Sequence, residues 1–514
     1  MGSTEFDTSF DHLQRLPKAE LIEVLLKTRE ERLAKEAEIS KLIEFIRILK
    51  QKHFGKSSEK VSQEQLGLFN EAEAEVLKSS EPEEETVHVP AHDRKRGKRK
   101  PLPEDLPRED LVIELSLEER TCPNDGTVMT EIGENIAERL DVVPMQIKVI
   151  RTIRKKYGCC ECEEQVKEAP VPPTAIPKSN ASEGLLAFII TSKYEDHLPL
   201  YRMESIFERY GVDLPRNTMG RWMVQSGELV QPLINLLEEE VLSSKYLQMD
   251  ETRVQVLKEN GKRAESLSYM WVRARLGPDP IILFDYDPSR SSDVPVKLLE
   301  GFSGHLQVDG YDGYCKVCKD QGILRIGCFA HCRRKFFEAS TATKKVGLAN
   351  IGLKFIKKLY AIEDAAREKS FEKRFAMRKE VAKPILDEMR AWVTAALPTV
   401  PPKTALGRAL SYTDNEWCYL IRYLEDGQLE IDNNYIENYI RPFALGRKNW
   451  LFSDTVEGAK ASANLYSLIS TARANGLQPY LYLRTVLEGI PRCKVLADFE
   501  ALLPLTVKNK TSLH

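Results

Sequence analysis

The chain has 514 residues, of which 42% are hydrophobic and 30% charged, and its formal net charge is −3. This length allows several domains with at least one large buried core, and the composition is typical of a soluble globular protein. No run of about 18 uncharged apolar residues occurs, and the N-terminus lacks the features of a secretory signal, so we expect no membrane partner. The near-neutral net charge neither favours nor excludes a nucleic-acid partner, because only local basic patches indicate one.

Two N-terminal segments are predicted from composition and spacing. Residues 1–56 favour a helical region with an interrupted coiled-coil seam, which is typical of dimerisation and equally of a helix packed on its own chain. Residues 57–118 change from acidic to basic, proline-containing runs, typical of a charged linker that can also contact DNA phosphates. The seam residues are Ile39, Leu42, Ile46 and Leu49.

Residues 119–168 predict a small zinc-ribbon-like, DNA-binding module. An opening cysteine is followed by two strand-like runs and a closing Cys-x2-Cys pair, the outline of two zinc knuckles. Asp125 stands where a second opening cysteine is expected, so the alternative is a ribbon that has lost its metal and is held by apolar packing. The candidate Zn²⁺ ligands are Cys122, Cys159 and Cys162, with Asp125 or Cys160 as the fourth.

Residues 180–244 predict a helical, helix-turn-helix-like region. A helix, a turn at Gly211 and a second helix that we expect to be capped near Asn217 have the spacing of that motif. Arg216, Asn217 and Arg221 would then meet DNA at the start of the recognition helix. Helix pairs joined by a glycine turn are also common in bundles that bind no DNA.

Residues 245–460 predict a ribonuclease H-like core with a helical insertion at about 336–425. Three strand-like runs precede a helix and further strands, which is the element order of that fold. Asp250 lies in the first strand and Asp309 at the end of the fourth, and these strands are neighbours in such a sheet. Two adjacent carboxylates repel each other unless cations neutralise them, so the pair predicts a site for Mg²⁺ (or Mn²⁺).

Other acids near these strands have ordinary explanations. Glu251 should point to the face of the strand opposite Asp250, because side chains alternate. Asp312 lies in a Gly-Tyr-Asp-Gly-Tyr turn, where aspartate is common. Asp287 and Asp293 flank a polar segment, and we expect a turn acid and a helix cap respectively.

A third acid is predicted in a short helix near residue 437. Asp432 should cap this helix, Glu437 should project from it, and Pro442 should end or kink it one turn later. The cations that follow suit a polyanion, since an acid can hold metal ions while arginine and lysine hold phosphates. The alternative is an ordinary helical ion pair beside a solvated basic loop. The candidate DNA-binding cations are Arg441, Arg447 and Lys448.

Several motifs make the sequence similar to the insertion-sequence-66 family of transposases. The most specific are VDGYDGY, GCFAHCRRKFFEA and DNNYIENYIRPFALGRKNWLFS, and FGKSSEK, MDET and CPNDG…YGCCEC resemble the same family. The resemblance covers nearly the whole chain and implies a DDE-type DNA transposase with Asp250, Asp309 and Glu437 as its catalytic, metal-binding acids. It implies strand cleavage and strand transfer at the ends of a mobile element. A ribonuclease H-like nuclease without strand transfer and a catalytically silent, transposase-derived DNA-binding regulator are the alternatives.

The resemblance also suggests residues around the site. The Cys-x2-His pair of the family falls on Cys328 and His331, which should border the site, and Arg333 and Arg334 could contact DNA. A second zinc site formed by this pair with Cys315 and Cys318 is an alternative allowed by spacing alone.

The remaining expectations concern the C-terminus and the partners. Residues 461–514 predict helices that pack on the core, with a break at Gly476. The resemblance implies double-stranded DNA as partner, both at element ends and at a target, and small accessory proteins of the same element. It further implies a homodimer or higher oligomer in the bacterial cytoplasm, associated with the nucleoid when bound to DNA.

Overall fold

The computed structural model describes residues 145–158, 166–341 and 347–511. Outside these ranges lie the predicted coiled-coil region, the charged linker and the candidate zinc ligands. The described part of the ribbon is a short antiparallel pair, β1 (Lys156–Gly158) and β2 (Val166–Glu168).

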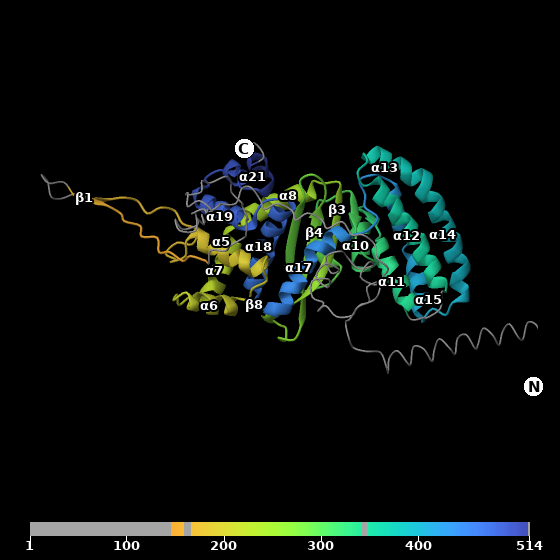
Figure 1. The fold of residues 1–514 in the computed structure, drawn as a ribbon, viewed down its shortest axis with the longest axis horizontal. Coiled ribbons are helices and arrows are strands. Elements are labelled where there is room, and N and C mark those ends of the chain that lie inside the picture. Colours follow the sequence, from red (N-terminus) through yellow and green to blue (C-terminus); the bar gives the residue numbers. More distant parts are fainter. Residues whose placement is uncertain (1–144, 159–165, 342–346, 512–514) are drawn as a thin grey trace, which may run out of the picture. The chain divides into compact units, whose positions relative to one another are not determined.

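A mixed sheet forms the centre of the protein from residue 245 onward (Figure 1). Its strand order is β5-β4-β3-β6-β7, in which β3, β4 and β5 are antiparallel while β6 and β7 run parallel to β3. The expected meander of three strands is therefore present, and a fourth strand lies beside the first. A short further strand, β8, pairs with the far end of β3. The strands are β3 (Tyr246–Lys258), β4 (Leu267–Arg275), β5 (Ile281–Asp287), β6 (His305–Gln307), β7 (Leu324–Ile326) and β8 (Ser453–Thr455).

The edge strand β5 is covered by helix α18 (Val456–Ala474). The hydroxyl of Ser467 accepts the N–H of Phe284 at 2.8 Å, and that of Thr471 accepts the N–H of Ile282 at 3.0 Å. These side chains satisfy backbone groups that would otherwise be free to pair with another chain. Because α18 begins before residue 461, the predicted boundary between core and C-terminal region falls inside this helix.

Within the described residues, four helices precede the sheet, and two of them have the predicted helix-turn-helix spacing. Gly211 has a φ of +75° in the turn between α6 and α7, a conformation that favours glycine. The residue that caps α7 is Pro215, which offers no side-chain hydrogen bond, so the cap predicted near Asn217 was wrong. The helices are α5 (Glu183–Tyr194), α6 (Leu200–Arg209), α7 (Arg216–Leu229) and α8 (Gln231–Leu242).

The predicted helical insertion is present between β7 and α17 (Asn434–Trp450), and its helices share an apolar core with Tyr246 of β3 and Ile326 of β7. Phe336, Ile356 and Met389, each with 0% exposure, contribute to this core. Among the described helices, none combines the length and apolar composition needed to cross a membrane. The helices of this region are α11 (Phe329–Thr341), α12 (Leu348–Ala366), α13 (Phe371–Met377), α14 (Lys383–Ala396), α15 (Ala405–Asn415) and α16 (Trp417–Leu420), with a π-helical segment at Arg378–Ala382.

The remaining elements are short helices at the sheet edge and at the C-terminus. Asp287 accepts the N–H of Ser289 at 2.7 Å, which confirms it as a turn acid. Asp293 was wrongly predicted as a cap, because Ser292 precedes the helix and Asp293 is its first residue. The predicted break at Gly476 is present, with a φ of +75°. These helices are α9 (Asp293–Leu298), α10 (Gly313–Asp320), α19 (Pro479–Gly489), α20 (Leu496–Glu500) and α21 (Pro504–Thr511).

Alanine substitutions at two glycines of α7 should change the free energy of unfolding in opposite directions. A Cβ at Gly227 would lie 2.5 Å from Cα of Ala461 on α18, so Gly227→Ala should lower stability by about 1–3 kcal/mol through overpacking. A Cβ at Gly220 would meet nothing closer than 3.9 Å, so Gly220→Ala should raise stability by about 0.5–1 kcal/mol. Urea denaturation of both variants measures this, and equal effects would contradict the close approach of α7 to α18.

Candidate active site

The two predicted aspartates lie just beyond paired residues of neighbouring parallel strands. Gln248 of β3 is in register with Gln307 of β6, and the same register brings Asp250 level with Asp309. The carboxylate of Asp250 accepts the N–H of Glu251 at 2.8 Å, and that of Asp309 accepts the N–H of Tyr311 at 2.9 Å. The pairing of β3 with β6 therefore brings Asp250, inside β3, near Asp309, which follows β6.

Glu437 reaches the site from the first turn of α17, whose start differs from the prediction. Asn433 is the N-cap residue and makes no side-chain capping bond, so Asp432 was wrongly predicted as the cap. Asp432 still accepts the N–H of Asn434 at 3.0 Å, and the hydroxyl of Tyr360 donates to it at 2.5 Å.

Of the two predicted effects of Pro442, an end or a kink, the end is wrong, because α17 continues to Trp450. Proline removes one helical hydrogen bond, but the buried face of the helix continues on both sides of it. Burial of this apolar face outweighs the lost bond, and it keeps Glu437 on a long helix. The buried residues of that face are Ile436, Ile440, Phe443 and Gly446.

The three acids are partly buried and lie near like charges. Burial raises the pKa of Asp250 well above its ordinary value, and Glu251, Asp309 and Glu437 raise it further. Burial also raises the pKa of Glu437, while Arg334 at 3.6 Å opposes this shift. Such repulsion is relieved by a proton or by a cation, so the arrangement favours cation binding at neutral pH.

His331 faces Glu437 as a neutral imidazole. Its Nδ1 atom lies 3.8 Å from Oε1 of Glu437, and both atoms are buried without a hydrogen-bond partner among the described residues. Burial and the neighbouring Arg334 lower the pKa of His331 to about 4, so this contact is not an ion pair at neutral pH. Cys328 is buried nearby and accepts the N–H of Asn433 at 3.5 Å, which places the predicted Cys-x2-His pair beside Glu437.

The donor set fits a hard divalent cation better than zinc. Carboxylate oxygens are the ligands that Mg²⁺ and Mn²⁺ prefer, and Oε1 of Glu437 has an unused acceptor position. In the ranges that the structure describes, no three His, Cys, Asp or Glu residues lie close enough together to hold a metal ion already. The second zinc site that spacing allowed gains no support, because Cys315 is exposed whereas Cys328 is buried.

The predicted DNA-binding residues are distributed over three elements. Arg216, Asn217 and Arg221 are all exposed on α7. The guanidinium of Arg333 on α11 lies 5.6 Å from the centre of the Tyr360 ring on α12.

The cations on α17 differ in their surroundings. Arg447 donates hydrogen bonds to the Arg253 carbonyl and to the Thr252 hydroxyl of β3, so its side chain is anchored on the sheet. Lys448, by contrast, is exposed, and the charge of Arg441 acts on Glu437. Arg441 therefore lies near Glu437, whereas Arg447 is held on β3 and Lys448 faces solvent.

Several polar residues of the site were not predicted from the sequence. Glu251 is buried, accepts a hydrogen bond from Tyr314 at 2.6 Å and pairs with Arg290. Gln248 and Gln307 are fully buried in the two strands that carry the aspartates. The available signal was a glutamine two positions before each acid, on the same face of an otherwise apolar strand.

Four family models match separate parts of the chain. Residues 178–461 match the model described as "Transposase IS66 family", which includes the three acids. Residues 41–111 match "Transposase C of IS166 homeodomain" and residues 119–163 match "zinc-finger binding domain of transposase IS66". Residues 467–505 match "IS66 C-terminal element".

Similar full-length proteins occur in Sinorhizobium fredii. The uncharacterized protein y4jD is 33% identical over 472 residues, which cover 85% of this chain and 92% of that protein. The uncharacterized protein y4qI is 32% identical over 493 residues, covering 91% of this chain and 89% of that protein. Both alignments extend well beyond the sheet and its acids.

The crowding of acids predicts a pH-dependent gain in stability for Asp250→Asn. Since the pKa of Asp250 is raised on folding, the folded chain keeps a proton that the unfolded chain loses. The free energy of unfolding therefore falls as pH rises from 3.8 through the raised pKa, by about 1.4 kcal/mol per unit of elevation. Asp250→Asn should be more stable than the wild type at pH 8 in EDTA, with a smaller difference near pH 4.

Thermal unfolding measured across this pH range tests the prediction. Asp312→Asn is the matched control, because it removes an exposed carboxylate from the neighbouring turn. A gain that is independent of pH, or one equalled by the control, would contradict crowding at Asp250.

Proposed function

Because the chain belongs to the transposase IS66 family, we propose that it is a DDE-type DNA transposase that performs metal-dependent strand cleavage and strand transfer. One observation carries the proposal. Asp250, Asp309 and Glu437 come from three separate parts of the chain. Burial, together with the charges of Glu251, Asp309 and Glu437, raises the pKa of Asp250. Like charges this close are costly for a purely structural role, whereas a divalent cation would offset their repulsion.

We propose a ribonuclease H-like core for residues 245–460. The supporting feature is the strand order, with three antiparallel strands followed by two strands parallel to the first. Asp250 lies in β3 and Asp309 two residues after the end of the neighbouring β6, and the helical insertion separates both in sequence from Glu437.

Asp250, Asp309 and Glu437 would hold Mg²⁺ or Mn²⁺. Ions bound there would activate a water or a 3′-hydroxyl as the nucleophile and would stabilise the oxygen that leaves the phosphodiester. Arg334 and Arg441 act on Glu437 electrostatically, which favours its charged form and provides positive charge for a phosphate. His331 stays neutral beside Glu437 and therefore adds no charge to the site.

Other parts of the chain would bind DNA and partner subunits. The exposed Arg216, Asn217 and Arg221 of α7 would contact one DNA segment, and Arg333 and Lys448 would lie nearer the reacting phosphate. The zinc-finger match supports a Zn²⁺-holding ribbon despite Asp125. We propose that residues 1–56 contribute to a homodimer or higher oligomer.

Asp309→Asn should abolish both strand cleavage and strand transfer. Loss of one charged metal ligand should lower the rate at least about 100-fold, since partners outside the ligand shell alone account for 10–100-fold effects. DNA binding in EDTA should stay unchanged. Labelled element ends incubated with target DNA and Mg²⁺ measure cleaved and joined products separately.

The same assay separates the alternatives. Cleavage without joined product in the wild type would indicate a nuclease, and no metal-dependent product at all would indicate a silent DNA-binding regulator. Full activity in Asp309→Asn would exclude the proposed acids. Asp312→Asn, from the neighbouring turn, is the control and should retain activity.

Arg221→Ala should weaken DNA binding through loss of one phosphate contact. The affinity should fall, and the slope of log affinity against log salt should decrease by about 1. Arg221→Lys keeps the charge and should keep the slope. Fluorescence anisotropy at several salt concentrations measures both, and an unchanged slope for the alanine variant would place DNA elsewhere.

A further inference from the structure

Two fully buried glutamines connect the strands of the proposed active site. Gln248 of β3 donates to the side-chain oxygen of Gln307 of β6 at 2.8 Å, and the hydroxyl of Tyr246 donates to the same oxygen. Buried amides are costly unless they are hydrogen-bonded, so a pair placed in two core strands needs an explanation.

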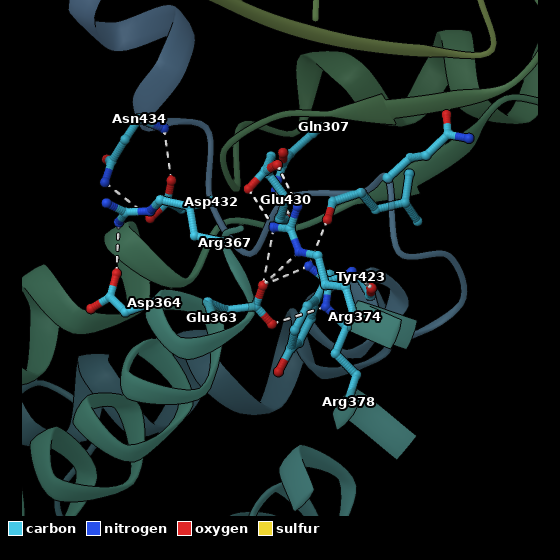
Figure 2. A network of polar contacts seen from close by, with 12 residues as sticks. Gln307, Glu363, Asp364, Arg367, Arg374, Arg378, Tyr423, Glu430, Asp432 and Asn434 are labelled. Carbon is cyan, nitrogen blue, oxygen red and sulfur yellow. Dashed lines mark hydrogen bonds and ion pairs between the residues drawn. The ribbon is translucent and has the colours of Figure 1, made fainter. Parts of the chain in front are cut away.

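Both glutamines hold the segment that leads into α17. The amide of Gln248 donates to the carbonyl of Asp432 at 3.0 Å, and its oxygen accepts the N–H of Ile436 at 3.1 Å. The amide of Gln307 donates to the carbonyl of Glu430 at 2.8 Å (Figure 2).

Gln248 thereby replaces the missing helix cap. Ile436 is the third residue of α17, and its N–H has no partner within the helix. The N-cap residue Asn433 makes no side-chain capping bond, and its buried amide has no hydrogen-bond partner among the described residues. The cap is supplied by Gln248 of β3, two residues before Asp250. The N–H that it caps belongs to Ile436, one residue before Glu437.

The helical insertion holds the same segment from the other side (Figure 2). Arg374 of α13 forms two hydrogen bonds with the carboxylate of Glu430, at 3.0 and 2.7 Å. Arg378 is fully buried, pairs with Glu363 of α12 at 2.7 Å and donates to the carbonyls of Tyr423, Asp426 and Leu429.

We propose that Gln248 and Gln307 are positioning residues that set the place of Glu437 relative to Asp250 and Asp309, with the helical insertion as the opposing support. The inference rests on the proposed function. The strands that carry the two aspartates also hold the helix that carries the glutamate, so one buried network fixes all three acids. Partners that orient metal ligands in this way typically account for 10–100-fold in metal affinity or activity.

Gln248→Met tests the proposal, because it keeps the length of the side chain and removes its hydrogen bonds. Mn²⁺ binding to the full chain, measured as loss of the free-ion resonance signal, should weaken about 10-fold or more. Amide hydrogen exchange at Ile436 should accelerate. In the cleavage assay kcat should fall while KM for DNA stays unchanged.

Ser467→Ala is the matched control, because it removes buried hydrogen bonds between Ser467 and the backbone of Phe284 in β5, on the far edge of the sheet. It should lower thermal stability and leave Mn²⁺ binding and Ile436 exchange unchanged. Gln307→Met is the second variant if Gln248→Met does not fold, and it should also weaken Mn²⁺ binding.

Two outcomes would overturn the proposal in distinguishable ways. If Asp309→Asn loses Mn²⁺ binding but both glutamine variants bind as the wild type does, the positioning role is wrong and the proposed function stands. If the wild type and Asp309→Asn bind Mn²⁺ equally, the proposed metal site fails and the positioning role fails with it.

Discussion

The parallel pairing of β3 with β6 is the constraint on which the site depends. Its register places Gln248 opposite Gln307 and, two residues further on, Asp250 level with Asp309. Since successive side chains on one face are two residues apart, the amide layer and the acid layer are tied to the same register. A slip of one residue would turn both layers to the other face of the sheet. The pairing therefore determines both the relative positions of Asp250 and Asp309 and the glutamine pair that the start of α17 contacts.

This arrangement has an electrostatic cost that the surrounding residues only partly offset. Asp250 is buried beside other carboxylates, whereas Glu437 receives opposing charge from Arg334 and Arg441. The arginines near Glu437 do not neutralise the charge of Asp250, which lies among the other carboxylates. The fold thus holds acids together against their repulsion, and the buried hydrogen bonds of Gln248 help to resist their separation.

The meander, the paired helices α6 and α7, and the position of each acid could be predicted because they follow from local signals. Strand and helix periodicity extend over many residues, and Asp309 lies in a motif that resembles a family. Local rules failed where tertiary packing outweighed them. Pro442 predicts an end or a kink, yet α17 continues past it with its apolar face. Asp432 predicts a cap that the structure assigns to Asn433.

The network that holds α17 could not be predicted for a different physical reason. Gln248 and Ile436 are 188 positions apart in sequence, and no local pattern links a strand amide to the third N–H of a distant helix. Arg378 likewise meets the carbonyls of Tyr423 and Leu429 only because the insertion folds back on the loop before α17. Such contacts give the insertion a role that its composition does not reveal. It closes the loop between the second and third acids and holds that loop against the sheet.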